Sequence, residues 1–200
     1  LVDTFGRVAR DLRVSLTDRC NLRCSYCMPP EGLDWLPTEE TLTDDEVVRL
    51  VRVGVERLGI LQVRFTGGEP LLRRGLEGII EACSHLRTDE GNPLDLALTT
   101  NALGLAKRAQ GLKDAGLNRV NISLDSLDPE HFAAITRRDR LGDVLEGIEA
   151  AARAGLSPIK VNALVLRGMN EADLPDLVDY CLDRGIELRV IEQMPIGPPD

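Results

Sequence analysis

The stretch TDDEVVRLVRVGVERLGILQVRFTGGEP, residues 43–70, contains one complete structural unit of this chain. Thr43 and Glu46 have the spacing of a capping box, and apolar residues then recur at helical spacing, which predicts a helix over 44–58. Gly59 stands where a helix ends in a left-handed turn, and the run 61–66 that follows is predicted to be a strand. The apolar face predicted for the helix comprises Val47, Leu50, Val51, Val55 and Leu58.

The same unit of helix, glycine and strand recurs along almost the whole chain. Gly116, Gly155 and Gly185 repeat the position of Gly59, each just before an apolar run. Such repeats favour parallel strands joined by right-handed crossovers. We therefore expect an α/β fold, a partial (β/α)6 TIM-like barrel with parallel strands, in which residues 1–200 form one domain and the chemistry lies at the carboxyl ends of the strands. The predicted strands are 12–17, 61–66, 94–99, 119–124, 159–165 and 187–193, and the other predicted helices with defined bounds are 76–87, 142–154 and 171–184.

Composition narrows the class of protein. The 200 residues are 43% hydrophobic, which suffices for one domain with a core. The net charge of -9 argues against a general nucleic-acid binder, because phosphate contacts need Lys and Arg. No apolar run approaches the length of a membrane span, and the start of the chain has no targeting signal. We therefore expect a cytoplasmic protein that binds neither nucleic acid nor membrane.

Three of the five cysteines lie within eight residues, in the sequence Cys20-Asn-Leu-Arg-Cys24-Ser-Tyr-Cys27 directly after the first predicted strand. An odd number of cysteines with three clustered does not fit a disulfide framework, and indicates metal or redox chemistry. Structural zinc takes four protein ligands, whereas three thiolates on a four-iron cluster leave one iron open to a cofactor. A zinc site that borrows a fourth ligand is the alternative. Cys83 and Cys181 lie on apolar helical faces and are interpreted as buried structural residues.

Two motifs together carry a resemblance to a known family. The spacing Cys20-x3-Cys24-x2-Cys27, with Tyr26 before the last cysteine, resembles the signature of the radical S-adenosylmethionine (SAM) superfamily, and Thr66-Gly-Gly-Glu-Pro70 resembles its glycine motif. The resemblance implies a partial six-stranded barrel as the radical SAM core domain. It also implies a [4Fe–4S] cluster on the three cysteines, with SAM on the open iron.

Further segments resemble the GTP 3′,8-cyclase family of molybdenum cofactor biosynthesis. They are Arg13–Asn21, Tyr26–Pro29, Arg64–Leu71, Thr99–Asn101, Asn121–Asp125, Lys160–Asn162 and Glu192–Pro195. The resemblance implies a lyase that cyclises GTP to a 3′,8-cyclo-dihydro-GTP, after a 5′-deoxyadenosyl radical has taken hydrogen from ribose C3′. No catalytic residue is expected apart from the cofactor and substrate ligands. The SAM contacts implied are Tyr26, Gly68, Ser123 and Met194, with Glu69 a further candidate for the SAM amine, and the GTP contacts implied are Arg13, Arg64, Thr99 and Lys160.

The phase of the residues in the strands supports a polar site independently of the resemblance. Alternate side chains of a strand share a face, so Asn121, Ser123 and Asp125 lie opposite Ile122 and Leu124. Most of the predicted strands carry such a polar row. Lys160, one of three lysines, stands inside an apolar strand. A buried lysine without a partner is costly, so we expect an anionic partner such as a triphosphate.

The family resemblance also sets expectations about what lies outside this chain. A second cysteine triad, which would hold a second [4Fe–4S] cluster, is expected only in a longer chain. The partners implied are GTP and an unidentified low-potential electron donor, and a homodimer is left open. Two alternatives stay open: another radical SAM enzyme with a different substrate, and a non-catalytic zinc-binding barrel. His85 and His131 are interpreted as incidental, and the pairs Arg73-Arg74 and Arg137-Arg138 as solvated.

Overall fold

The computed structural model describes residues 2–193, so Met194 lies outside the described residues. Six parallel strands form one sheet in the order β1-β2-β3-β4-β5-β6, which confirms the predicted α/β fold. The bounds of the strands are β1 Asp11–Ser15, β2 Gln62–Thr66, β3 Asp95–Thr100, β4 Arg119–Ser123, β5 Ile159–Val165 and β6 Glu187–Glu192. Neighbouring strands follow one another in the chain, and each connection between them contains at least one helix, as a (β/α) repeat requires.

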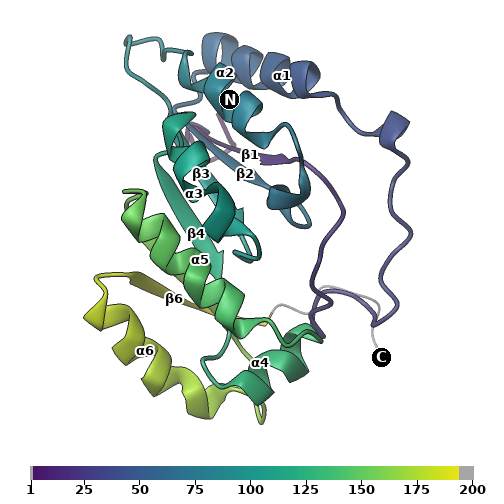
Figure 1. Cartoon of the computed structure of the whole chain (residues 1–200). Coiled ribbons are helices and arrows are strands. Elements are labelled where there is room, and N and C mark those ends of the chain that lie inside the picture. The colour runs from purple at the N-terminus through teal and green to yellow at the C-terminus, as the bar shows by residue number, and fades with distance from the viewer. Residues whose placement is uncertain (1, 194–200) are drawn as a thin grey trace.

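The helices cover one side of the curved sheet and leave its other side open (Figure 1). Their bounds are α1 Asp44–Leu58, α2 Leu76–Ser84, α3 Leu105–Asp114, α4 Pro129–Thr136, α5 Leu141–Arg153 and α6 Leu174–Asp183. Three short 3-10 turns, η1 Thr38–Glu40, η2 Pro70–Leu72 and η3 Glu171–Asp173, complete the connections. None of these helices, within the described residues, has both the length and the apolar character needed to cross a bilayer.

Local sequence signals explain the helix ends. The capping box at Thr43 and Glu46 is present, and Gly59 ends α1 in the left-handed conformation. Gly116, Gly155 and Gly185 also have positive φ. The helix predicted over 171–184 begins later, because 171–173 form the 3-10 turn and the α-helix starts at Leu174 with Pro175 in its first turn. Between β4 and β5 the chain forms two helices, of which only the second, α5, was predicted with defined bounds.

The core lies between the sheet and the helices. Phe65, Leu96, Leu98 and Ile122 point from the strands toward the helices and are fully buried. The apolar faces predicted for the helices were too wide, since Leu50 and Leu182 are 54% and 71% exposed and Leu58 is also exposed. The alternate residues of the strands face the open side, and they form the polar rows in which the candidate sites lie.

Candidate functional site

A pocket of about 210 Å³ lies at the carboxyl ends of the strands, and the three clustered cysteines line it. Tyr26, Gly68, Ser123 and Thr99 line the same pocket, although they come from four different parts of the chain. The fold therefore gathers in one place the three cysteines, three of the four SAM contacts implied by the resemblance, and one of the GTP contacts. Met194, the fourth SAM contact, lies outside the described residues.

The cysteine loop begins just after β1 and turns sharply at its second cysteine. The backbone N–H groups of Cys27 and Met28 donate to the carbonyl of Cys24 at 2.9 and 3.1 Å. The thiols of Cys20 and Cys24 are half-buried, and that of Cys27 is exposed. Burial raises the pKa of the Cys24 thiol to about 12, so this thiol is neutral until a metal displaces its proton. Within residues 2–193, no three His, Cys, Asp or Glu side chains are arranged to hold a single metal ion.

The glycine loop after β2 packs directly against the segment that leads into the cysteine loop. The backbone N–H of Gly68 donates to the carbonyl of Thr17, and that of Glu69 to the carbonyl of Arg19, both at 2.7 Å. A Cβ atom on Gly68 would lie 2.6 Å from the carbonyl carbon of Arg19, and closer still to the oxygen. Only glycine allows the two backbones to approach this closely.

Glu69 is fully buried beside the pocket, and the protein itself supplies its hydrogen bonds. Its carboxylate accepts from the Thr100 hydroxyl and from the Asn101 backbone N–H at 2.7 Å, and from the Leu71 N–H at 2.9 Å. Burial raises the pKa of this carboxyl group, and the three donors oppose the shift. Glu69 therefore ties the loop after β2 to the loop after β3, and its contact with the SAM amine stays a prediction.

Asp125, at the end of β4, orients the aromatic side chain of the cysteine loop. The Tyr26 hydroxyl donates to Asp125 Oδ2 at 2.8 Å, and the Leu164 N–H donates to Oδ1 at 2.8 Å. Asn170 donates from its side chain to the backbone carbonyls of Asp125 and Leu164. Burial is the main reason that the pKa of the Asp125 carboxyl is raised. Sequence reasoning placed Asp125 in a polar row, but it gave no signal for a contact across 99 residues.

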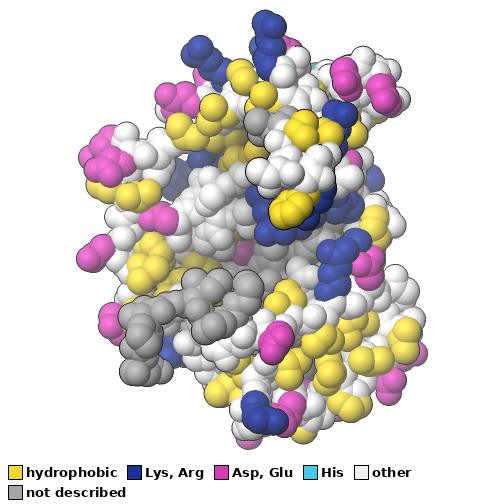
Figure 2. All heavy atoms as spheres, turned by 180° about the vertical axis from the view of Figure 1, so that it is seen from behind, with side chains coloured by type: hydrophobic (Ala, Val, Ile, Leu, Met, Phe, Trp, Pro, Cys, Tyr) yellow, Lys and Arg dark blue, Asp and Glu magenta, His cyan; other side chains and the backbone are white. Residues whose placement is uncertain are grey.

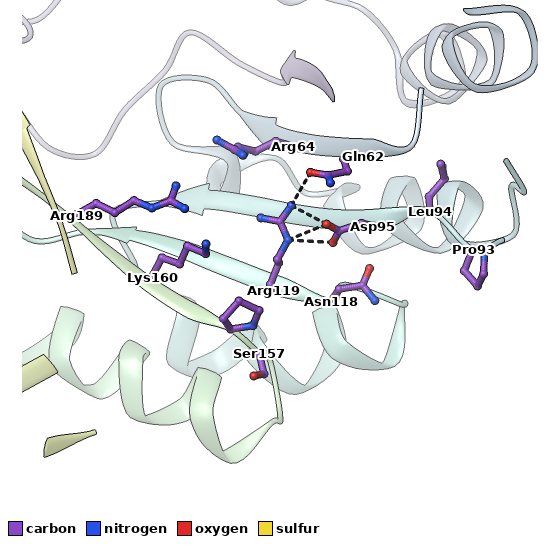
Figure 3. A pocket seen from close by; sticks show the side chains of 11 residues that line it. Gln62, Arg64, Pro93, Leu94, Asp95, Asn118, Arg119, Ser157, Lys160 and Arg189 are labelled. Atoms are coloured by element: carbon purple, nitrogen blue, oxygen red, sulfur yellow. Dashed lines mark hydrogen bonds and ion pairs between the residues drawn. The ribbon is translucent and has the colours of Figure 1, made fainter. Parts of the chain in front are cut away.

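A second pocket, of about 630 Å³, lies near the amino ends of the strands on the open side of the sheet. Arg64, Lys160, Arg119 and Arg189 line it, and Figure 3 shows their side chains around one space. Arg119 is held by Asp95, with N–O distances from 2.7 to 3.0 Å. Seen from the side opposite to that of Figure 1, Lys and Arg side chains gather around a hollow in the molecule (Figure 2).

The second pocket contains two of the four GTP contacts implied by the resemblance, Arg64 and Lys160. Lys160 is 15% exposed, as expected for an inward-facing lysine, but it forms an ion pair with Glu187 at 2.7 Å. The anionic partner expected for Lys160 is therefore a carboxylate of the protein itself, because the register of β5 and β6 places Glu187 directly beside it, and a contact with a triphosphate stays a prediction. Arg13 is exposed and does not line the pocket, although it is the register partner of Arg64 on β1. Arg119 and Arg189 were not predicted.

Arg64 has a buried nitrogen in this pocket, Nε, without a hydrogen-bond partner in the described residues. Its Nη2 lies 3.6 Å from a carboxylate oxygen of Asp11. Burial is the main reason that the pKa of the guanidinium is lowered, and neighbouring arginines add to the effect. Such a site favours an anion, which would meet both the charge and the free donor.

In each of the two arginine pairs predicted to be solvated, one arginine is exposed and the other is not. Arg74 and Arg138 are exposed, as expected. Arg73 is 13% exposed and donates to the carbonyls of Leu16 and Leu42, and Arg137 is half-buried against the cysteine loop. His131 is also not incidental, since its ring nitrogen lies 2.8 Å from a carboxylate oxygen of Asp173.

Comparison with known proteins gives the family. The family model of the radical SAM superfamily matches residues 14–181. The chain is 65% identical over 198 residues to a GTP 3′,8-cyclase of Corynebacterium glutamicum, covering 99% of this chain and 52% of that protein. It is 60% identical over 196 residues to a GTP 3′,8-cyclase 2 of Mycobacterium tuberculosis, covering 98% of this chain and 53% of that protein. The chain thus spans about half the length of the curated relatives it matches.

Solved structures agree on the fold. Streptococcus suis SuiB superimposes with a TM-score of 0.75 at 20% identity, over 94% of this chain and 41% of that one. A structure titled native anSMEcpe with bound AdoMet gives a TM-score of 0.72 at 18% identity, over 92% of this chain and 51% of that one. Since the family model accounts for most of the residues, and the cysteine and glycine loops meet at one end of a partial barrel, this chain belongs to the radical SAM superfamily.

Proposed function

We propose that this chain is the core domain of a cytoplasmic enzyme that cyclises GTP to 3′,8-cyclo-dihydro-GTP, the first step of molybdenum cofactor biosynthesis. One observation carries the proposal: the open face of the sheet has a thiol-lined pocket at one end and a cationic pocket at the other. A nucleoside triphosphate has a matching arrangement, with an anionic triphosphate at one end and, at the other end, the nucleoside at which the reaction occurs. The identity to GTP 3′,8-cyclases supports this choice of substrate.

The residues of the thiol-lined pocket fit a [4Fe–4S] cluster with an open iron. Cys20, Cys24 and Cys27 would each bind one iron, and no other cysteine lines this pocket. Tyr26, Gly68 and Ser123 would contact SAM, the glycine by letting the backbone approach the cofactor. When bound, the cluster and SAM supply a carbon radical through one-electron cleavage of the sulfonium, with the electron from a low-potential donor. A second cluster belongs to a longer chain.

The cationic pocket would bind the triphosphate. Arg64 offers a buried Nε without a partner in the described residues, and Arg189 and Lys160 lie around the same space. Arg is suited to bidentate contacts with phosphate. Lys160 would release its ion pair with Glu187 and bind a phosphate oxygen instead. The Glu187 side chain is 47% exposed on the edge strand β6. Arg13 would reach the substrate from the next strand.

The polar row between the two pockets would hold the nucleoside. Asn121 donates to the Thr99 hydroxyl at 3.3 Å, and Thr99 also lines the thiol pocket. Thr99 therefore lies where the ribose of a bound nucleotide would pass from one pocket to the other. Holding the ribose C3′ close to the reacting carbon of SAM is the main task of these residues, since proximity lowers the barrier most.

The experiment that tests the proposal has two parts. We would reconstitute the protein anaerobically with iron and sulfide, count the iron and record EPR spectra of the reduced protein with and without SAM. About four irons and a spectrum that changes with SAM would support the cofactor assignment. Retained zinc and no cluster would instead leave a zinc-binding barrel.

GTP binding is then measured by calorimetry for Arg64→Ala and Arg189→Ala, with Arg153→Ala as a matched control. Arg153 is exposed on α5, does not line the pocket and, within the described residues, pairs only with Glu149. We expect each pocket variant to weaken GTP binding by roughly tenfold or more, because a charge-assisted hydrogen bond to phosphate is lost. If the cluster responds to SAM but both pocket variants bind GTP as tightly as the wild type, the protein would be a radical SAM enzyme with a different substrate.

A further inference from the structure

Arg137 joins the two sides of the cysteine loop. Its Nη1 donates to the carbonyl of Arg23 at 2.8 Å and to the carbonyl of Met28 at 2.9 Å. Arg23 precedes Cys24 and Met28 follows Cys27, so one nitrogen brackets the segment that contains two of the three thiols. We propose that Arg137 is a positioning residue that holds this segment in the shape that binds the cluster.

The end of α4 supports the same segment through the backbone. The N–H of Arg23 donates to the carbonyl of Thr136 at 3.0 Å, and the N–H of Ser25 donates to the carbonyl of Ile135 at 2.9 Å. These carbonyls belong to the last turn of α4, where a helix leaves its acceptors without intrahelical partners. The last turn of α4 and the Arg137 side chain therefore contact the loop together.

The backbone of Arg137 has a conformation that favours glycine, although the residue carries a long side chain. It ends α4 in the left-handed conformation, with φ 56° and ψ 30°. A residue with a Cβ is strained there, and glycine is the usual choice. Arg138 follows it and is exposed, and within the described residues its side chain donates only to the neighbouring carbonyl of Arg137. Of the two adjacent arginines, only Arg137 contacts the cysteine loop through its side chain, and only Arg137 has a left-handed backbone.

The consequence rests on the proposed function, because it assumes that the loop binds a cluster. A loop whose thiols are already held in place loses less conformational freedom when it binds iron, and it releases iron more slowly. Arg137 does not contact the thiols, so its effect passes through the backbone of residues 23–28. Loss of the side chain should loosen this segment and leave the rest of the barrel intact.

The test uses Arg137→Gly and Arg137→Ala, with Arg138→Ala as the matched control. In the cluster-free protein, the amides of Ser25, Cys27 and Met28 should exchange hydrogen about tenfold faster in both Arg137 variants, because two hydrogen bonds to charged guanidinium are lost. After reconstitution, both variants should lose iron to a chelator about tenfold faster than the wild type. Arg138→Ala should match the wild type in both measurements.

The glycine variant separates positioning from general stability. Glycine relieves the left-handed strain, so Arg137→Gly should melt at a higher temperature than Arg137→Ala while it loses iron equally fast. Iron retention equal to the wild type in Arg137→Gly, or equal losses in Arg138→Ala, would overturn the proposal while the cluster assignment stands. If the wild type binds no cluster, the proposed function fails, and unchanged amide exchange in the Arg137 variants would still overturn the contact on its own.

Discussion

Gly68→Ala should destabilise the fold far more than a single methyl group suggests. The new Cβ would lie 2.6 Å from the carbonyl carbon of Arg19 and closer still to the oxygens of Arg19 and Asp18. Carbon atoms pack at about 3.5–4.0 Å, so the two loops must separate by roughly 1 Å. That movement breaks the hydrogen bonds from the N–H groups of Gly68 and Glu69 to the facing backbone, both 2.7 Å long.

The expected magnitude follows from these contacts. Two backbone hydrogen bonds contribute about 1 kcal/mol each, and overpacking costs about 1–3 kcal/mol, for a total of roughly 3–5 kcal/mol. In a chain of this size each kcal/mol lowers the melting temperature by about 2–4 °C, so we expect a drop of roughly 10 °C. Thermal unfolding of the cluster-free protein, followed by circular dichroism, measures this directly.

Gly78→Ala is the matched control for the same chemical change. Gly78 lies in α2, is exposed, and a Cβ there would meet nothing within 4 Å. Alanine favours the helix over glycine by about 1 kcal/mol, so this variant should melt slightly above the wild type. Equal melting temperatures for Gly68→Ala and the wild type would refute the close approach of the two loops.

Three further outcomes follow from single contacts. Asp125→Ala should weaken SAM binding to the reconstituted protein, measured by the EPR response, because the Tyr26 hydroxyl loses its acceptor; an unchanged response would contradict this. The hydrogen bond to Asp173 raises the pKa of His131 above its ordinary 6.5, so the stability it contributes is full below about pH 6 and lost as pH rises through the raised value. The difference in melting temperature between the wild type and His131→Ala should therefore shrink by pH 8, and a constant difference would refute the ion pair. Cys181→Ser should keep the cluster iron and lower stability by about 1–3 kcal/mol in denaturant titration, because it buries a hydroxyl without a partner; loss of iron would show that the thiol is a ligand.

The sequence predicts the strand order because its signals are local. A capping box, a glycine after four of the six helices and an apolar run after each glycine are all read within about 20 residues, and the order of strands in a (β/α) repeat follows from them. The width of the buried face of each helix is not a local property of the sequence. Leu182 and Leu50 have the spacing of core residues, but whether a neighbour covers them depends on the tertiary packing of helices, which the spacing does not contain.

The same limit explains what was missed in the candidate site. The loop residues Cys20, Tyr26 and Gly68 belong to motifs that are contiguous in the chain, so sequence could locate them. Arg189 lines the cationic pocket only because β6 pairs with β5 in one particular register. That register also places Glu187 beside Lys160, so the anionic partner expected for this lysine is a side chain that the sequence did not identify. A shift by one residue would turn these side chains to the helix-covered face of the sheet.

The chain on both sides of α4 contacts the cysteine loop. Before α4, Asp125 accepts the hydroxyl of Tyr26, and after α4, Arg137 donates to the carbonyls of Arg23 and Met28. The residues on either side of α4 thus both contact the segment 23–28, about 100 residues away in the chain. These contacts hold the Tyr26 side chain and the backbone on both sides of Cys24 and Cys27, so a change at Asp125 or Arg137 should first appear as altered cluster or SAM binding. Loss of the fold should require a change in the core beneath the sheet, such as at Phe65 or Ile122.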